Sequence, residues 1–263
     1  MPSIATALTW PETDVALVTL TRDAEMNTLT LDFLNEMDAI LTELEHRPVR
    51  ALIITGSGRA FCCGAHLDYF TAENMDPDAR FRLRDTYLNR IASLYDRLEE
   101  QRYPVIAAIN GYALGGGCEL ALSCDFRIMA RGTFLGLPEV KLGALAGAGG
   151  VQKLARHVGR SKAIEWILLG THIPAEEAER RGLLYTISEP AVLMDAALDL
   201  ARKLNALSSR AISQSKAAVY MCEETDLRTA RRIGLESLAM LIDSRDWQIG
   251  IKAFHNKTPP DFS

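Results

Sequence analysis

PVIAAINGYALGGGCELALSCDFRIMA, residues 104–130, passes from one apolar run to another through three consecutive glycines. Residues 104–111 have the length and apolar character of a buried strand, and residues 126–130 are typical of a second, shorter strand. Gly115 to Gly117 lead into a short predicted helix that carries a single carboxylate, Glu119, among apolar neighbours. Two strands joined by a helix predict a right-handed crossover within a mostly parallel sheet.

The same alternation of strand and helix extends toward the N-terminus. Residues 14–21 and 51–58 are predicted strands, because they are apolar and rich in β-branched side chains. Between them, apolar residues recur at helical spacing after Thr30, which is a suitable N-cap. A second amphipathic helix is predicted over residues 80–100. We therefore expect an α/β core that extends over residues 1–190.

The last third of the chain is predicted to be mainly helical. Gly170 is a C-cap candidate, and Pro174 is placed to begin a helix at its first position. Residues 191–263 are expected to form a helical region that packs on the core as part of one unit. The elements predicted after residue 148 are helices over 149–159, 161–170, 174–182, 194–207, 209–224 and 226–244, and a brief strand over 183–189.

Composition narrows the class of protein. The chain has 263 residues, 48% hydrophobic content and a net charge of −5, which argues against nucleic-acid binding through bulk positive charge. Its five cysteines are an odd number without metal-ligand spacing, and the N-terminus has no signal-peptide pattern, so a reducing, cytoplasmic location is expected. Since no apolar run reaches the ~20 residues that a membrane helix needs, no membrane partner is expected.

Three segments rich in small residues are candidates for ligand contact: FCCGAH (61–66), LGGG (114–117) and GALAGAGG (143–150). None fits a Walker A or dinucleotide-binding pattern. The first two follow predicted parallel strands, at the edge where open α/β sheets bind ligands. Two such loops side by side can each point one backbone amide at the same oxygen and form an oxyanion hole. The alternative, that the glycines only permit turns and close packing, stays open on the pattern alone.

Two glutamates lie in apolar surroundings near these loops. Glu119 falls in the first turn of the predicted helix, and Glu139 follows Pro138 in GLPEVKLG, residues 136–143. Burial raises the pKa of a carboxyl group, and two such groups in different environments can divide the acid and base roles of a reaction. Each glutamate also has a simpler explanation, as a helix cap or, for Glu139 beside Lys141, as a surface charge.

Taken in order, these segments resemble the enoyl-CoA hydratase/isomerase (crotonase) superfamily over nearly the whole chain. The resemblance implies an α/β core of repeated strand–strand–helix units, the crotonase-like ββα spiral, and C-terminal helices that mediate trimerisation, with trimers often paired into hexamers. It implies an acyl-CoA thioester substrate and no metal or redox cofactor, because coenzyme A is part of the substrate. The matching segments are DAEMNTLT (23–30), ITGSGRAFCCGAHL (54–67), PVIAAINGYALGGGCELALSCDFRIMA (104–130), LGLPEVKLGALAGAGGVQKLARHVG (135–159), PAEEAERRGLL (174–184) and AFHNKTPPDF (253–262).

The resemblance also assigns roles to individual residues. The backbone amides of Ala65 and Gly116 match the oxyanion hole for the thioester carbonyl. Glu119 and Glu139 match the two catalytic glutamates of hydratases, with Glu119 as the main base toward water and Glu139 as the proton donor. The implied contacts with substrate and coenzyme A are Ala65, His66, Leu67, Asp68, Gly116, Gly147, Phe254 and Lys257, the last two often from a neighbouring subunit.

The pair of acids favours an enoyl-CoA hydratase of lipid metabolism, a hydro-lyase. The alternatives are an isomerase, in which the same pair moves a proton between C2 and C4, a specialised acyl-CoA dehydratase, and a non-enzymatic binding module with this fold. The chain departs from the family pattern at His66, where aspartate is usual, at Asp68, where a basic residue is frequent, and at Ala146 and Asp23, where proline is common. These departures bear on acyl specificity and coenzyme A affinity.

Overall fold

The computed structural model describes residues 5–71, 76 and 78–262, and these form two sheets. The larger sheet has six strands in the order β1-β2-β3-β5-β7-β10. Its strands run parallel except for the antiparallel pair of β1 and β2, as the alternation of strands and helices predicts. The six strands are β1 (Thr6–Glu12), β2 (Val15–Leu20), β3 (Ala51–Gly56), β5 (Val105–Ile109), β7 (Phe126–Ala130) and β10 (Thr186–Ser188).

A smaller sheet has four strands in the order β4-β6-β8-β9. The sequence pattern does not predict this sheet, because strands of two or three residues are too short to show an alternation of side chains. FCCGAH, expected to be a loop, begins inside β4. The four strands are β4 (Ala60–Cys62), β6 (Tyr112–Leu114), β8 (Phe134–Gly136) and β9 (Ile173–Pro174).

The chain alternates between the two sheets in three successive steps. β3 leads to β4, β5 to β6 and β7 to β8, and a helical segment follows each pair of strands. Neighbouring steps lie in parallel register, with Ile54 opposite Ala107 in the large sheet and Cys62 opposite Ala113 in the small one. This repeat of two strands and a helix is the ββα spiral that the resemblance implies.

Helices connect the steps and largely match the predicted ranges. The Oγ1 of Thr30 accepts a hydrogen bond from the amide of Phe33 at 3.2 Å, which confirms the predicted N-cap. The predicted helix over residues 80–100 contains a π-helical turn at Arg84–Leu88, and Pro174 lies at the N-cap position, one residue before the first helical position. Among the described residues, no helix is both long and apolar enough to span a bilayer. The helices up to residue 205 are α1 (Leu31–Glu45), α2 (Ala79–Leu83), α3 (Asn89–Glu99), α4 (Gly116–Leu122), α5 (Gly150–Val158), α6 (Arg160–Leu168), α7 (Ala175–Arg180) and α8 (Leu193–Asn205).

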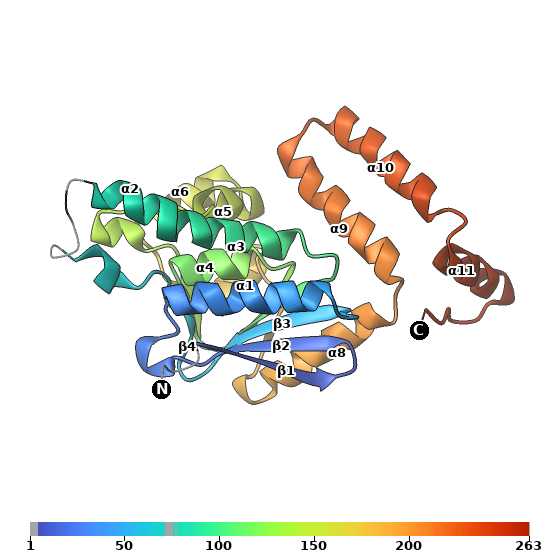
Figure 1. Cartoon of the computed structure of the whole chain (residues 1–263), viewed down its shortest axis with the longest axis horizontal. Helices are drawn as coiled ribbons and strands as arrows, with labels where there is room; N and C mark the ends of the chain where they lie inside the picture. Colours follow the sequence, from blue (N-terminus) through green and yellow to red (C-terminus); the bar gives the residue numbers. More distant parts are fainter. Residues whose placement is uncertain (1–4, 72–75, 77, 263) are drawn as a thin grey trace.

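Helices cover both faces of the large sheet (Figure 1). Because successive strand side chains point to opposite faces, Leu52 and Ile54 of β3 join the cluster that contains α1, α3 and α4. Ile53 faces the other way and lies in a separate cluster with Leu193 and Leu200 of α8. Full burial of one such side chain contributes about 1.5–3 kcal/mol to folding. The contacts of Leu193 and Leu200 place α8 on the second face of the sheet. The predicted division of the chain at residue 190 stays a prediction.

Three helices project away from this core: α9 (Ser209–Glu224), α10 (Leu227–Leu241) and α11 (Arg245–Asn256) (Figure 1). α11 lies within the region expected to be helical, but its bounds are not predicted. Large apolar side chains on these helices are open to solvent, and Met240 and Phe254 are 79% and 77% exposed. Extended apolar surface of this kind is typical of contacts between subunits. The expected trimer stays a prediction, and these helices offer the surface that it requires.

Candidate active site

Two loops meet at the candidate site, one after β4 and one at the start of α4. A Cβ atom added to Gly64 would lie 2.7 Å from the amide nitrogen of Gly116, so these backbones are in close contact. Gly64 also has a φ of +84°, a left-handed conformation that favours glycine. FCCGAH and LGGG therefore lie side by side, and the contact between them leaves no room for a side chain.

Each loop leaves one backbone amide available. Within the described part of the chain, the N–H groups of Ala65 and Gly116 donate to no protein acceptor. The atoms around them are fixed: Tyr95 Oη donates to the Gly116 carbonyl at 2.6 Å, and the His66 amide donates to Tyr87 Oη at 2.9 Å. Burial raises the pKa of both tyrosines, which keeps their hydroxyls protonated. The two amides are therefore held in place and open to a ligand oxygen.

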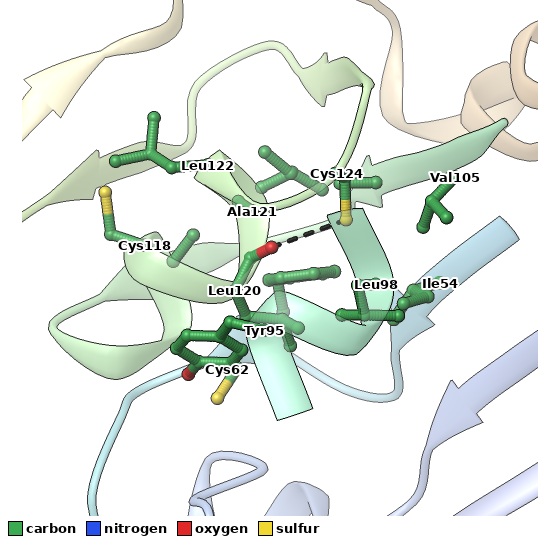
Figure 2. Packing of buried hydrophobic residues seen from close by; sticks show 14 of the residues in the cluster. Ile54, Cys62, Tyr95, Leu98, Val105, Cys118, Leu120, Ala121, Leu122 and Cys124 are labelled. Atoms are coloured by element: carbon green, nitrogen blue, oxygen red, sulfur yellow. Dashed lines mark hydrogen bonds between the residues drawn. The ribbon is translucent and has the colours of Figure 1, made fainter. Parts of the chain in front are cut away.

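An apolar cluster supports the start of α4 (Figure 2). Leu120 and Tyr95 belong to it, together with the thiols of Cys62, Cys118 and Cys124. All three cysteines are free and buried, and burial raises the pKa of Cys62 to about 12. Buried thiols of this kind behave as small apolar side chains. The cluster therefore gives the loop a rigid base.

Glu119 occupies the first turn of α4, as the sequence predicts, and is only 4% exposed. Its Oε1 accepts two backbone hydrogen bonds, from Ala148 at 2.8 Å and from Gly150 at 2.9 Å. Burial raises the pKa of this carboxyl group, while the two amides and the charge of Lys153 act in the opposite direction. A carboxylate that accepts hydrogen bonds from a helix N-terminus is held in one orientation and is partly compensated for its burial.

Glu139 begins a short 3-10 helix, Glu139–Leu142, directly after Pro138. Its side chain approaches the glycine loop, since a Cβ atom added to Gly115 would lie 3.1 Å from Glu139 Oε1. Its Oε2 is buried and has no hydrogen-bond partner among the described residues. Burial and the charge of Glu119 both raise the pKa of Glu139. A buried carboxyl oxygen without a protein partner is suited to a proton that moves to or from a ligand.

Together these groups form a site for acid–base chemistry at a carbonyl compound. Two open amides can stabilise negative charge on a carbonyl oxygen. Two carboxyl groups with raised pKa, in different hydrogen-bonding environments, are suited to give and take protons. Within the described residues, no group of three His, Cys, Asp or Glu side chains is arranged to hold a metal ion.

The structure places the other predicted contact residues at two locations. His66, Leu67 and Asp68 follow the Ala65 amide, and His66 Nδ1 lies 3.0 Å from the Oγ1 of Thr28. Gly147 lies in the segment just before the amides that hold Glu119, and a Cβ atom added to it would meet no atom within 4 Å.

Phe254 and Lys257 do not reach this site within one chain. They lie at the end of α11, which is separated from α4 by α9 (Figure 1). Their predicted contact with coenzyme A therefore depends on a neighbouring subunit and stays a prediction.

Several contacts at the site are not predicted from the sequence. The amides of Ala148 and Gly150 hold Glu119, whereas the sequence prediction names only their neighbour Gly147, as a contact with the substrate. The run GAGG before a helix was a usable signal, because consecutive small residues at a helix N-terminus expose their amides. Tyr87 and Tyr95 carry no comparable signal, since a tyrosine in an amphipathic helix is usually an ordinary core residue.

Glu119→Gln is expected to raise the melting temperature at pH 8 by about 2–4 °C, the change that ~1 kcal/mol produces in a chain of this size. The pKa of Glu119 is raised in the folded state, so ionisation of this buried group costs stability above that pKa. The cost disappears as the pH falls through the raised pKa, and the difference between wild type and variant should shrink toward acid pH. Thermal unfolding between pH 5 and 8 measures it.

The matched control for this stability experiment is Glu43→Gln, because Glu43 is an exposed glutamate on α1 that pairs with Arg47. Its melting temperature should change little over the same pH range. A destabilised Glu119→Gln variant, or a difference that does not depend on pH, would contradict the assignment of a burial cost to Glu119.

Comparisons with known proteins cover almost the whole chain. A family model described as enoyl-CoA hydratase/isomerase matches residues 11–263. The short-chain-enoyl-CoA hydratase of Clostridium acetobutylicum is 37% identical over 248 residues, which span 94% of this chain and 93% of that protein. The 2,3-dehydroadipyl-CoA hydratase of Escherichia coli is 36% identical over 252 residues, or 94% of each chain. The crystal structure of an enoyl-CoA hydratase from Bacillus anthracis matches with a TM-score of 0.91 and 34% identity, and the match covers 98% of both chains.

Proposed function

The chain belongs to the enoyl-CoA hydratase/isomerase family and has the crotonase fold, and from this premise we propose that it adds water to the double bond of a 2-enoyl-CoA thioester. One observation carries the proposal. Two carboxyl groups with raised pKa, Glu119 and Glu139, lie beside a glycine loop whose open amide is paired with a second one from Ala65. Hydration of an enoyl thioester needs this combination of an oxyanion site, a base and an acid.

The amides of Ala65 and Gly116 are proposed to bind the thioester carbonyl oxygen. When water adds at C3, the electrons of the double bond move toward C2 and the carbonyl, so that this oxygen gains negative charge. Two fixed N–H donors stabilise the enolate, and loss of one such donor typically costs about 10²–10³-fold in rate. The fixed Tyr95 and Tyr87 hydrogen bonds support this role, because a donor that is already in place needs no reorganisation during the reaction.

Glu119 is proposed as the base and Glu139 as the acid. Glu119 removes a proton from the attacking water, whose oxygen forms a bond with C3, and Glu139 delivers its proton to C2. The hydrogen bonds to Glu119 favour its ionised form, and the neighbouring charge on Glu119 favours the protonated form of Glu139. Proton exchange with solvent then restores both groups. Because the two acids interact, their apparent pKa values belong to the pair.

The proposed reaction requires no separate cofactor, since the two amides and two acids supply every step and coenzyme A arrives with the substrate. We further propose assembly into a homotrimer or a pair of trimers through the exposed faces of α9, α10 and α11. In such an assembly Phe254 and Lys257 of one subunit would contact coenzyme A bound to the next. The exposed side chain of Phe254 supports this proposal.

Isomerisation or dehydration by the same acids is the second candidate within this family. The name of the family model includes both hydratases and isomerases, and the same pair of acids can move a proton between C2 and C4. The two relatives named above are equally similar to this chain but carry names with different acyl groups, short-chain and dehydroadipyl. Similarity of this degree therefore does not identify the acyl chain. A pure binding module is disfavoured, since it has no use for two neighbouring acids with raised pKa.

Hydration of crotonyl-CoA is expected to abolish the ultraviolet absorbance of its conjugated enoyl thioester. A panel of short, branched, aromatic and dicarboxylic 2-enoyl-CoA esters, followed at the same wavelength, would define the acyl preference. An isomerase would give the opposite signal with 3-enoyl-CoA esters, because the double bond moves into conjugation. The double variant Glu119→Gln, Glu139→Gln, which lacks both proposed acids, is the inactive control. If the wild-type protein changes no member of the 2-enoyl panel, the hydratase proposal fails.

A further inference from the structure

Lys153 lies in the first turn of α5, the helix whose first amide holds Glu119. Its Nζ donates to Ser123 Oγ at 2.8 Å and forms an ion pair with Glu99 of α3. Ser123 Oγ in turn donates to the backbone carbonyl of Glu119 at 2.9 Å. One ammonium group therefore links three helices: α5, which supplies an amide to the carboxylate, α4, which carries the carboxylate, and α3.

This ion pair is too buried to be an ordinary surface contact. The side chains of Lys153 and Glu99 are 15% and 18% exposed, and Ser123 is fully buried. Removing two charges from water is costly, and a pair of apolar side chains of the same volume often stabilises a fold as well or better. Packing alone therefore does not explain why charged side chains occupy these two positions.

We infer that Lys153 is a positioning residue for Glu119, which holds the first turn of α5 against the carboxylate and favours its ionised form. The inference rests on the proposed function of Glu119 as base. Lys153 acts at the carboxylate in two ways. Through Ser123 it fixes the distance between α4 and α5, and therefore the hydrogen bonds from Ala148 and Gly150, and its positive charge attracts the carboxylate.

The titratable groups that face Glu119 come from four elements. Lys153 on α5 is the only cation whose charge lowers the pKa of Glu119 in the described structure, and Glu139 on the 3-10 helix is an acid whose pKa the charge of Glu119 raises. Tyr95 on α3 and Cys118 on α4 also face it, and both are neutral because burial raises their pKa. Loss of Lys153 would therefore leave only the hydrogen bonds from Ala148 and Gly150 to oppose the effect of burial on the pKa of Glu119.

Lys153→Met is expected to move the acid limb of the kcat/KM profile toward higher pH by at least about half a unit. Glu119 acts as a base only when ionised, and a higher pKa means that it loses its charge at a higher pH. We also expect kcat at the optimum to fall about 10-fold, the usual effect of removing a supporting partner, while KM stays within about twofold. Lys153→Arg keeps the charge and should restore the wild-type limb.

Glu99→Gln is the companion variant, which should shift the acid limb in the opposite direction. It removes the anion that offsets Lys153, so the acid limb should move toward lower pH. A purely structural ion pair gives a different result, because Lys153→Met and Glu99→Gln would then both lower the melting temperature and leave the limb where it is. That result would overturn the inference. If Lys153→Met does not fold, the direction in which the acid limb moves in Glu99→Gln still tests it.

A direct titration separates this inference from the proposed function. Glutamate labelled with ¹³C at Cδ reports each carboxyl group by NMR, and the Glu119→Gln variant identifies the Glu119 signal. We expect the midpoint for Glu119 to rise in Lys153→Met and to return in Lys153→Arg. If the wild-type protein hydrates no enoyl-CoA but the midpoint moves, the proposed function fails and the inference holds. If hydration occurs and the midpoint is unchanged, the inference alone fails.

Discussion

Glu119→Gln is expected to lower kcat for enoyl-CoA hydration by about 10²–10⁴-fold, the usual contribution of a general base. Glutamine keeps an Oε1 that can accept the hydrogen bonds from Ala148 and Gly150, so the loop geometry should survive. What is lost is the negative charge that removes a proton from water. Steady-state kinetics with the best substrate of the panel measures the effect, and calorimetric binding of a saturated acyl-CoA should change little.

Glu139→Gln is the parallel test of the acid. The amide cannot deliver a proton to C2, and kcat should fall by at least about 100-fold. Since both acids act in one step, the double variant should lose much less than the product of the two single losses. Glu43→Gln, an exposed glutamate on α1, is the control and should keep wild-type kinetics. Activity near that of the wild type in either active-site variant would remove that residue from the mechanism.

Gly64→Ala is expected to lower kcat/KM by at least about 100-fold, the cost of losing one oxyanion-hole donor. The added methyl group would lie 2.7 Å from the amide nitrogen of Gly116 and 3.0 Å from the carbonyl of Leu114, and both of these are backbone atoms. One loop must therefore move, and with it the amide of Ala65 or of Gly116. The loss should appear mainly in kcat, because the donors matter most for the charged intermediate.

Gly132→Ala is the matched control for Gly64→Ala. Its φ of +78° is nearly the same as the +84° of Gly64, but a Cβ atom at Gly132 would meet no atom within 4 Å. Both variants therefore suffer a similar left-handed strain of about 1 kcal/mol, and only Gly64→Ala disturbs the loop contact. If both variants keep kcat/KM within about threefold of the wild type, the two amides are not the oxyanion hole.

The sequence predicts the parts of the fold that depend on local pattern. The strands over residues 51–58 and 104–111 are found as β3 and β5, because a buried strand in a parallel sheet is a continuous apolar run. β1 is not predicted, since half-exposed side chains and a proline break its apolar pattern. The small sheet is not predicted either, because its two- and three-residue strands are stabilised by tertiary packing and show no pattern of their own.

The candidate site divides in the same way. Glu119, Glu139 and the two glycine loops are predicted from their residue types and their local sequence context. The family resemblance supplies their roles. The hydrogen bond from the Gly150 amide to Glu119 joins two residues that are 31 positions apart in the sequence. A Cβ atom at Gly150 would lie 2.6 Å from Glu119 Cγ, so the glycine is explained by a neighbour that is distant in sequence. Contacts of this kind become visible only in three dimensions.

The parallel pairing of β4 with β6 has a consequence for how such a protein can diversify. Cys62 pairs with Ala113, and Ala65 and Gly116 each lie three residues beyond those partners. Because adjacent strands lie about 4.8 Å apart, the two loops that carry the proposed donors begin side by side, whatever the length of the chain between them. Insertions or deletions between Asp68 and Tyr87 can change that connection, while the strand pairing and the hydrogen bonds of Tyr87 and Tyr95 keep the two amides in place. A protein with this architecture can therefore vary one connecting segment while it keeps the spacing of the two proposed donors.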